Sequence, residues 1–203
     1  MTGVADELAD HGYENPAISY YLTSIYDHSI FEAFSKVIQK LIPNLAILEA
    51  MLNDLCRACR FEKVYLFDVM SKIYIATDSS PLDMASYEIC SDLIDVVIDV
   101  SEIYSWQRPD EYNKSLEGPP WNQTLANQMA SMDAEAQVVL REGERPIMLK
   151  EVNKFLCLVA VCAENSYDKT AEMTQNLETT VKGLRQVFET TKRRMDHQNA
   201  TGT

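Results

Sequence analysis

The chain has 203 residues, 46% of them hydrophobic, so it is long enough and apolar enough to fold around one substantial core. Its 31 Asp and Glu residues outnumber 18 Lys and Arg residues, which gives a formal net charge of −13. This balance argues against binding to nucleic acid or unaided docking on acidic lipid, because both need clustered positive charge. No apolar run approaches the roughly 20 residues that cross a bilayer, so we expect no direct membrane insertion.

The first part of the chain carries few structural signals. Residues 1–17 show no apolar period, so we expect a flexible lead-in there. Ile18–Ile25 is rich in β-branched and aromatic side chains, which predicts a strand. The next segment repeats apolar residues at helical spacing and predicts a helix that ends before Pro43.

From Asn44 onward the chain shows a regular succession of elements. Asn44 can cap a helix that runs to about Arg60. The following segments predict two strands, a long helix, three strands and a final amphipathic helix, at residues 62–69, 71–78, 83–104, 134–141, 146–152, 153–163 and 167–194. This α-β-β-α-β-β-β-α order predicts an α+β domain, with a five-stranded, mostly antiparallel sheet and helices on its faces. We expect an exposed excursion at 105–133 and a disordered tail at 195–203.

The helix predicted at 83–104 has an unusually wide apolar face. At about 100° per residue, five carboxylates share one stripe about 80° wide, and apolar side chains cover about 220° of the remainder. An ordinary surface helix has an apolar face of a little over ~100°. One layer beneath the helix cannot cover such an arc. Either the helix is central within its own domain, or a partner protein covers its second side.

Motifs that carry chemistry are scarce. None of the six glycines forms a P-loop or a Gly-x-Gly-x-x-Gly fingerprint. The three histidines lie in the lead-in, at a helix start and in the tail, where no catalytic or ligand role is expected. Cys56 and Cys59 form a single Cys-x-x-Cys without a second pair, so we expect five reduced thiols rather than a zinc site. We therefore expect no catalytic residue, no metal and no cofactor in this chain.

Three runs of sequence are similar to one known family. They are LTSIYDHSIFEAFSKVIQKLIP, SKIYIATDSSPLDMASYEICSDLIDVVIDVS and LKEVNKFLCLVAVC. Together they resemble the C/D-type Rag GTPases, the group that includes the fungal vacuolar homologues. The resemblance implies that residues 18–43 are the last strand and helix of a GTPase domain. It also implies that residues 44–194 are a C-terminal, roadblock-type (longin-like) dimerisation domain.

The resemblance also bears on nucleotide binding. Thr23, Ser24 and Ile25 would match the loop that faces the guanine base, a remnant that is not functional alone. The P-loop, the switch segments and the base-reading motif have no counterpart before Ile18, so we expect this chain not to be an enzyme. Full-length family members would bind GTP or GDP with Mg²⁺ and hydrolyse GTP. The chain would then be a fragment, a truncated form or an incomplete gene product.

A dimer interface is implied as well, because roadblock domains pair through their central helices and the neighbouring edge strands. In this chain those are the helix 83–104 and the strand 134–141. The implied interface residues are Ile89, Leu93, Ile94, Val96, Val97, Ile98, Val100, Ile103, Val138 and Leu140. The sequence does not say which part of the apolar arc meets the partner and which part meets the sheet.

The implied partner is the C-terminal domain of an A/B-type Rag, in a heterodimer that a Ragulator- or EGO-type scaffold holds. The family relays amino-acid sufficiency to the TOR kinase complex. We therefore expect a cytoplasmic protein that its partners recruit to the lysosomal or vacuolar surface. One alternative is a free-standing roadblock or longin-like scaffold subunit, against which the base loop argues. Another is a small-ligand sensor of similar layering, which would need a roomy pocket beside the sheet.

Overall fold

The computed structural model describes residues 2–13, 18–104, 134–140, 145–163 and 170–201. Its centre is one five-stranded sheet in the order β2-β1-β5-β4-β3, with every neighbouring pair antiparallel. The strands are β1 (Phe61–Asp68), β2 (Tyr74–Thr77), β3 (Glu135–Leu140), β4 (Arg145–Asn153) and β5 (Leu156–Cys162). The five-stranded antiparallel sheet that the sequence predicts is therefore confirmed.

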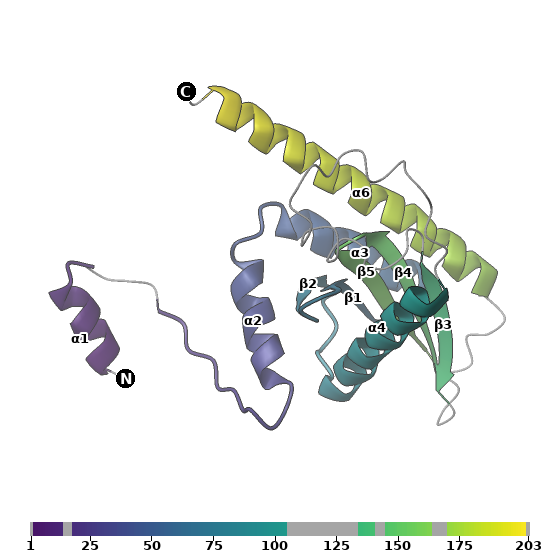
Figure 1. Cartoon of the computed structure of the whole chain (residues 1–203), viewed down its shortest axis with the longest axis horizontal. Coiled ribbons are helices and arrows are strands. Elements are labelled where there is room, and N and C mark those ends of the chain that lie inside the picture. Colours follow the sequence, from purple (N-terminus) through teal and green to yellow (C-terminus); the bar gives the residue numbers. More distant parts are fainter. Residues whose placement is uncertain (1, 14–17, 105–133, 141–144, 164–169, 202–203) are drawn as a thin grey trace.

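Helices cover both faces of this sheet (Figure 1). On one face lie α3 (Leu45–Cys59) and α6 (Thr170–Thr201), and on the other lies α4 (Met84–Tyr104). The order α3-β1-β2-α4-β3-β4-β5-α6 agrees with the order predicted from Asn44 onward. None of the helices within the described ranges is long and apolar enough to span a membrane.

The central strands are apolar on both sides because both sides are covered. Along β1, Leu66 faces the α3 and α6 side, whereas Tyr65 and Phe67 face α4. Every residue of β5 is buried, which explains the uninterrupted apolar run of this strand.

Two of the contacts between α3 and α6 show how closely these helices pack. Gly183 on α6 leaves space for Met51, since a Cβ atom at Gly183 would lie 2.7 Å from the Met51 Cε atom. Asn44 stands at the N-cap position of α3, but its backbone is left-handed, with φ of 70°, and its side chain makes no capping bond. Its Nδ2 atom instead donates to the Thr191 Oγ1 atom at 3.0 Å. The predicted capping role of Asn44 is therefore wrong, and the residue ties two helices together.

The ends of the chain differ from the prediction in three ways. Residues 2–10 form a helix, α1 (Thr2–Asp10), where a loose lead-in was expected, and it lies apart from the sheet (Figure 1). Ile18–Ile25 is not a strand, although one was predicted there. This segment pairs with none of the described strands of the sheet, so its backbone has no strand partner there. The final helix continues to Thr201, past the predicted start of a disordered tail at residue 195.

The helix predicted before Pro43 is present as α2 (Ser29–Gln39), and it packs against the sheet edge at β2. The buried Ser35 hydroxyl donates to the Phe31 carbonyl at 2.8 Å and accepts from the Tyr74 N–H of β2 at 3.1 Å. Phe34 and Val37, on the other hand, are 52% and 43% exposed. The division of the chain at residues 43 and 44 remains a prediction, and the excursion at 105–133 lies outside the described residues.

Candidate pairing surface

The helix α4 begins at a capped end. The Asp83 Oδ2 atom, just before the helix, accepts hydrogen bonds from the Ser86 N–H at 3.1 Å and the Ser86 hydroxyl at 2.6 Å. These bonds, the one from the Ser86 hydroxyl foremost, lower the pKa of Asp83. An aspartate at this position satisfies N–H groups that have no partner inside the helix, so it fixes where α4 starts.

The inner face of α4 packs on the sheet. Tyr87, Cys90, Leu93 and Ile94 are buried there, and the Tyr87 hydroxyl donates to the Lys72 carbonyl at 2.6 Å. Ile94 is 1% exposed, so it cannot contact a partner while the sheet covers it. Its assignment to a dimer interface is not supported by its position, and the same holds for Leu93 at 6% exposure.

The opposite side of α4 carries apolar side chains that no described residue covers. We call them the outer stripe, and its members are Ile89, Val96, Val100 and Ile103, exposed by 38%, 56%, 49% and 71%. Their spacing of seven, four and three residues places them on one line along the helix. Among the described residues, this part of the wide apolar arc therefore stays exposed, whereas the inner part is covered by the sheet.

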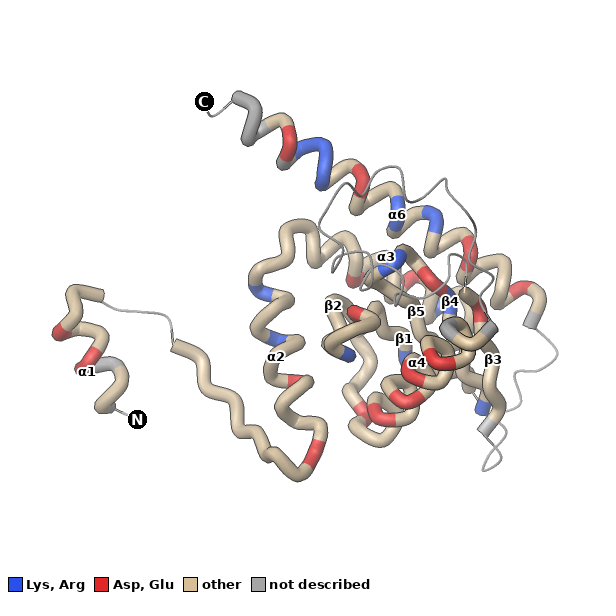
Figure 2. The backbone as a smooth tube through the Cα atoms, viewed as in Figure 1, with Lys and Arg blue, Asp and Glu red and all other residues tan. Residues whose placement is uncertain are grey.

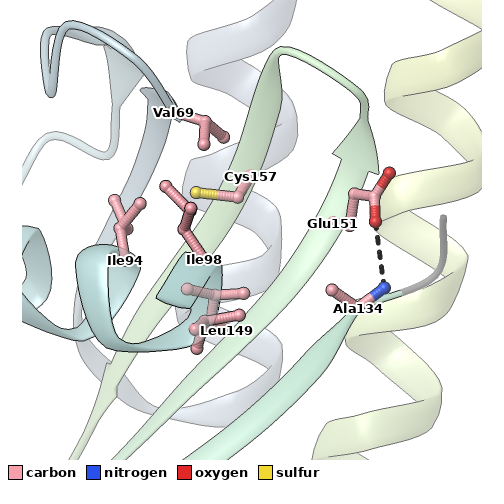
Figure 3. Close-up of a pocket in the computed structure, with 8 residues that line it drawn as sticks. Val69, Ile94, Ile98, Ala134, Leu149, Glu151 and Cys157 are labelled. Carbon is pink, nitrogen blue, oxygen red and sulfur yellow. Dashed lines mark hydrogen bonds between the residues drawn. The ribbon is translucent and has the colours of Figure 1, made fainter. Parts of the chain in front are cut away.

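Val97 and Ile98 are partly buried and pack against the inner face. With Ile94, Leu149 and Cys157 they line a cavity of about 10 Å³ between α4 and the sheet (Figure 3). That volume is about the size of one water molecule. This cavity is not the roomy pocket that a small-ligand sensor needs.

The strand β3 lies beside this region, and among the described strands it pairs with β4 alone, at the edge of the sheet. Val138 pairs with Ile147, whose side chain packs against the α4 side of the sheet, so Val138 lies on that side too. It is 39% exposed, and Leu140 pairs with Arg145 in the same register. The free N–H and C=O groups of an edge strand can bind another strand.

A buried carboxylate fixes the start of this edge. The Ala134 N–H donates to Glu151 Oε2 at 3.0 Å, and the Glu151 N–H donates to the Ala134 carbonyl at 2.9 Å (Figure 3). Glu151 is 3% exposed. Glu151 was not among the predicted site residues, although a lone acid inside an apolar strand is a signal that could have indicated such a role.

Carboxylates border the outer stripe. Figure 2 shows acidic residues spaced along α4, and the helix sequence contains no Lys or Arg. Asp95 forms an ion pair with Lys72 at 2.6 Å, and the Glu88 Oε1 atom lies 2.9 Å from the Nδ1 atom of His28. The exposed face of α4 thus combines an apolar line with a negative border.

The three residues of the predicted base loop lie before α2. The Ser24 N–H donates to the Ser29 hydroxyl at 2.9 Å, and the Ser24 hydroxyl accepts from the Tyr26 N–H at 3.1 Å. Thr23 and Ile25 are exposed. The nucleotide role of this loop stays a prediction.

Comparisons with known proteins identify the relatives of the chain. Residues 1–94 match the family described as the Gtr1/RagA G protein conserved region. The chain is 45% identical over 202 residues to the human Ras-related GTP-binding protein C. This alignment covers 98% of this chain and 46% of that protein. It is 43% identical over 183 residues to the GTP-binding protein gtr2 of Schizosaccharomyces pombe, with 90% of this chain and 54% of the relative covered. The chain thus spans about half the length of these relatives.

A solved structure shares the fold. Myxococcus xanthus MglB superposes with a TM-score of 0.50 at 11% identity, over 73% of this chain and 92% of that chain. At this identity the likeness concerns the fold alone. Sequence relatives and fold agree with the family indicated by the three sequence runs. The chain therefore belongs to the C/D-type Rag family of Ras-related GTP-binding proteins and carries a roadblock-type domain.

Proposed function

We propose that this chain is the heterodimerisation and scaffold-docking part of a Rag-type GTPase. The observation that carries the proposal is the outer stripe of α4, which lies exposed on the same side of the sheet as Val138 of the edge strand β3. A soluble domain rarely leaves a contiguous apolar surface exposed unless another protein covers it. Pairing through β3 would continue the sheet, and pairing through α4 would bury the stripe.

The partner in this proposal is the corresponding domain of an A/B-type Rag. The pair then docks on a Ragulator- or EGO-type scaffold at the lysosomal or vacuolar surface and relays amino-acid sufficiency to the TOR kinase complex. The family membership supports this role. Membrane recruitment through partners is consistent with the acidic composition, because a chain of net charge −13 gains nothing from anionic lipid.

Substitution of single residues by Asp tests the pairing surface. We expect Val96→Asp and Val100→Asp to abolish co-purification with the A/B-type domain, because each puts a carboxylate into an interface that excludes water. Both side chains are about half exposed, so circular dichroism of the variants should match that of the unmodified chain. Ile94→Asp should instead unfold the domain, since Ile94 is buried in its own core.

Ile47→Asp is the matched control. Ile47 is 49% exposed, like Val100, but it belongs to α3 on the opposite face of the sheet. Pairing should survive this change. Folded Val96→Asp and Val100→Asp variants that still bind the A/B-type domain would show that the partner docks elsewhere.

A further inference from the structure

Two carboxylates stand directly beside the outer stripe of α4. Asp92 is three residues after Ile89 and four before Val96, and Asp99 follows Val96 by three. Residues three and four apart are surface neighbours on a helix. Both aspartates are exposed. Among the residues that the structure describes, neither has a basic partner within ion-pair distance, whereas Asp95 is paired with Lys72.

These two side chains point away from the sheet. At about 100° per residue, Asp92 is about 160° around the helix from Ile94, which faces the sheet. Asp99 is about 140° from Ile94 by the same measure. The outer stripe lies between the inner face and this acidic edge on one side of the helix. Asp92 and Asp99 therefore border the outer rim of any interface that the stripe forms.

The two-fold symmetry of a homodimer determines how these charges affect the choice of partner. Two copies of the chain that pair through β3 are related by a two-fold axis perpendicular to the shared sheet. Such an axis leaves the direction away from the sheet unchanged, so the acidic edges of both helices lie on the same outer side of the paired helices. Packed helices lie about 8–10 Å apart, close to the screening length of about 8 Å at physiological salt. Self-pairing therefore brings like charges together, which disfavours it.

We propose, on the basis of the proposed function, that Asp92 and Asp99 select the partner of this surface. The geometry favours a second roadblock-type domain whose interface helix carries Lys or Arg along its outer rim, and it disfavours a second copy of this chain. The outer stripe then provides the contact area, and the two aspartates determine which domain binds there.

The test uses the full chain and the charge-reversed variant Asp92→Lys/Asp99→Lys. Mixed in equal amounts, the unmodified and reversed chains should pair with each other at least about tenfold more tightly than either pairs with itself. The reversed chain should also bind the A/B-type domain at least about tenfold more weakly than the unmodified chain does. Sedimentation equilibrium measures the first quantity, and calorimetric titration measures the second.

Asp54→Lys/Glu189→Lys is the matched control, because it changes the net charge by the same amount on exposed residues of α3 and α6. It should change neither affinity. If the reversed chain neither pairs with the unmodified chain nor loses its partner, the aspartates do not select, and the inference is overturned. In that case, loss of pairing in Val96→Asp would still support the surface itself. Equal effects of the control and the reversed variant would also overturn the inference, since net charge alone would then decide.

Discussion

The Lys63 Nζ atom lies 3.3 Å from Asp78 Oδ1 in the interior of the domain, and both residues are about 4% exposed. The ammonium also donates to the carbonyls of Asp78 and Ser80, at 3.1 and 2.7 Å. The carboxylate accepts from the Val64 and Ser80 N–H groups, each at 2.8 Å. This pair joins β1 to the segment between β2 and α4, so it ties the chain that leads into α4 to the sheet.

Asp78→Asn should destabilise the domain by about 3–5 kcal/mol at pH 7, because the Lys63 ammonium would remain buried without its counter-charge. The double variant Lys63→Met/Asp78→Asn removes that charge and should lose less. Urea unfolding of the three chains measures the difference. If the double variant is less stable than Asp78→Asn, the pair contributes through its hydrogen bonds rather than through charge.

The same pair predicts a pH dependence. Burial by itself raises the pKa of Asp78, but the hydrogen bonds from Ser80 and Val64 and the charge of Lys63 outweigh it, and the pKa lies below its usual value of 3.8. A lowered pKa in the folded state contributes stability that is complete above the unfolded pKa and is lost as the pH falls through the folded pKa. The stability gap between the unmodified chain and Asp78→Asn should therefore be constant from pH 7 to 5 and shrink below about pH 4. A gap that grows in acid would contradict this assignment.

The thiols should react slowly. Burial, followed by the nearby Asp78 carboxylate, raises the pKa of Cys56 to about 11, and burial raises the pKa of Cys90 and of Cys162 to about 12. At pH 8 about one Cys56 in a thousand is then a thiolate, against about a quarter of free cysteines. Ellman's reagent should label the folded chain more than about a hundredfold more slowly than the urea-unfolded chain.

Cys56 is half-buried and the other four cysteines are buried, so Cys56 should be the first to react. Cys56→Ser should remove the fastest phase of labelling and leave the rest unchanged. A fast phase that persists in Cys56→Ser would mean that a thiol described as buried is open to solvent.

We expect the helix α2 to open more readily than the helix α4. Ser35→Ala leaves the Tyr74 N–H without its acceptor, which costs about 1–3 kcal/mol. Hydrogen exchange should then rise in α2 and at Tyr74, with little change in α4. In the unmodified chain α2 should already open before α4, since Phe34 and Val37 are about half exposed. Thr190→Ala, which truncates an exposed hydroxyl on α6, should leave both helices unchanged.

This chain should not bind guanine nucleotide. A base loop alone offers one or two hydrogen bonds of roughly 1 kcal/mol each, far from the roughly −8 kcal/mol of micromolar affinity. In addition, the Ser24 N–H already donates to Ser29. Titration of a fluorescent GDP analogue should show no saturation. A micromolar dissociation constant would require a phosphate site that the sequence does not contain.

The sequence was sufficient to predict the sheet and the helix α4. The strands β1 and β5 and the helix α4 each carry an apolar pattern that reflects which of their own residues are buried. It was misleading at Ile18–Ile25, where β-branched and aromatic residues are present but the sheet offers no neighbour. A strand needs a partner as well as a propensity. Ser35 was missed for a related reason, because a hydroxyl that accepts from a strand 39 residues away leaves no local signal.

For the candidate surface, the helical wheel gave the extent of the apolar arc but not its orientation. Ile94 and Val96 are equally apolar and two residues apart, yet one is 1% exposed and the other 56%. Their roles are set by where the sheet contacts α4, which depends on packing across strands distant in sequence. Such contacts cannot be read from the period of one segment.

The bond between Ser35 and Tyr74 has a consequence for how far assembly can proceed. The sheet ends at β2 and at β3, and each end could in principle accept a further strand. At β2, however, a backbone N–H is already bound to the Ser35 hydroxyl, and α2 packs against the strand. A sheet that can accept a further strand at β3 but not at β2 can be extended by one further domain. If the domain associates through β3 as proposed, assembly should therefore stop at two domains rather than continue into a filament.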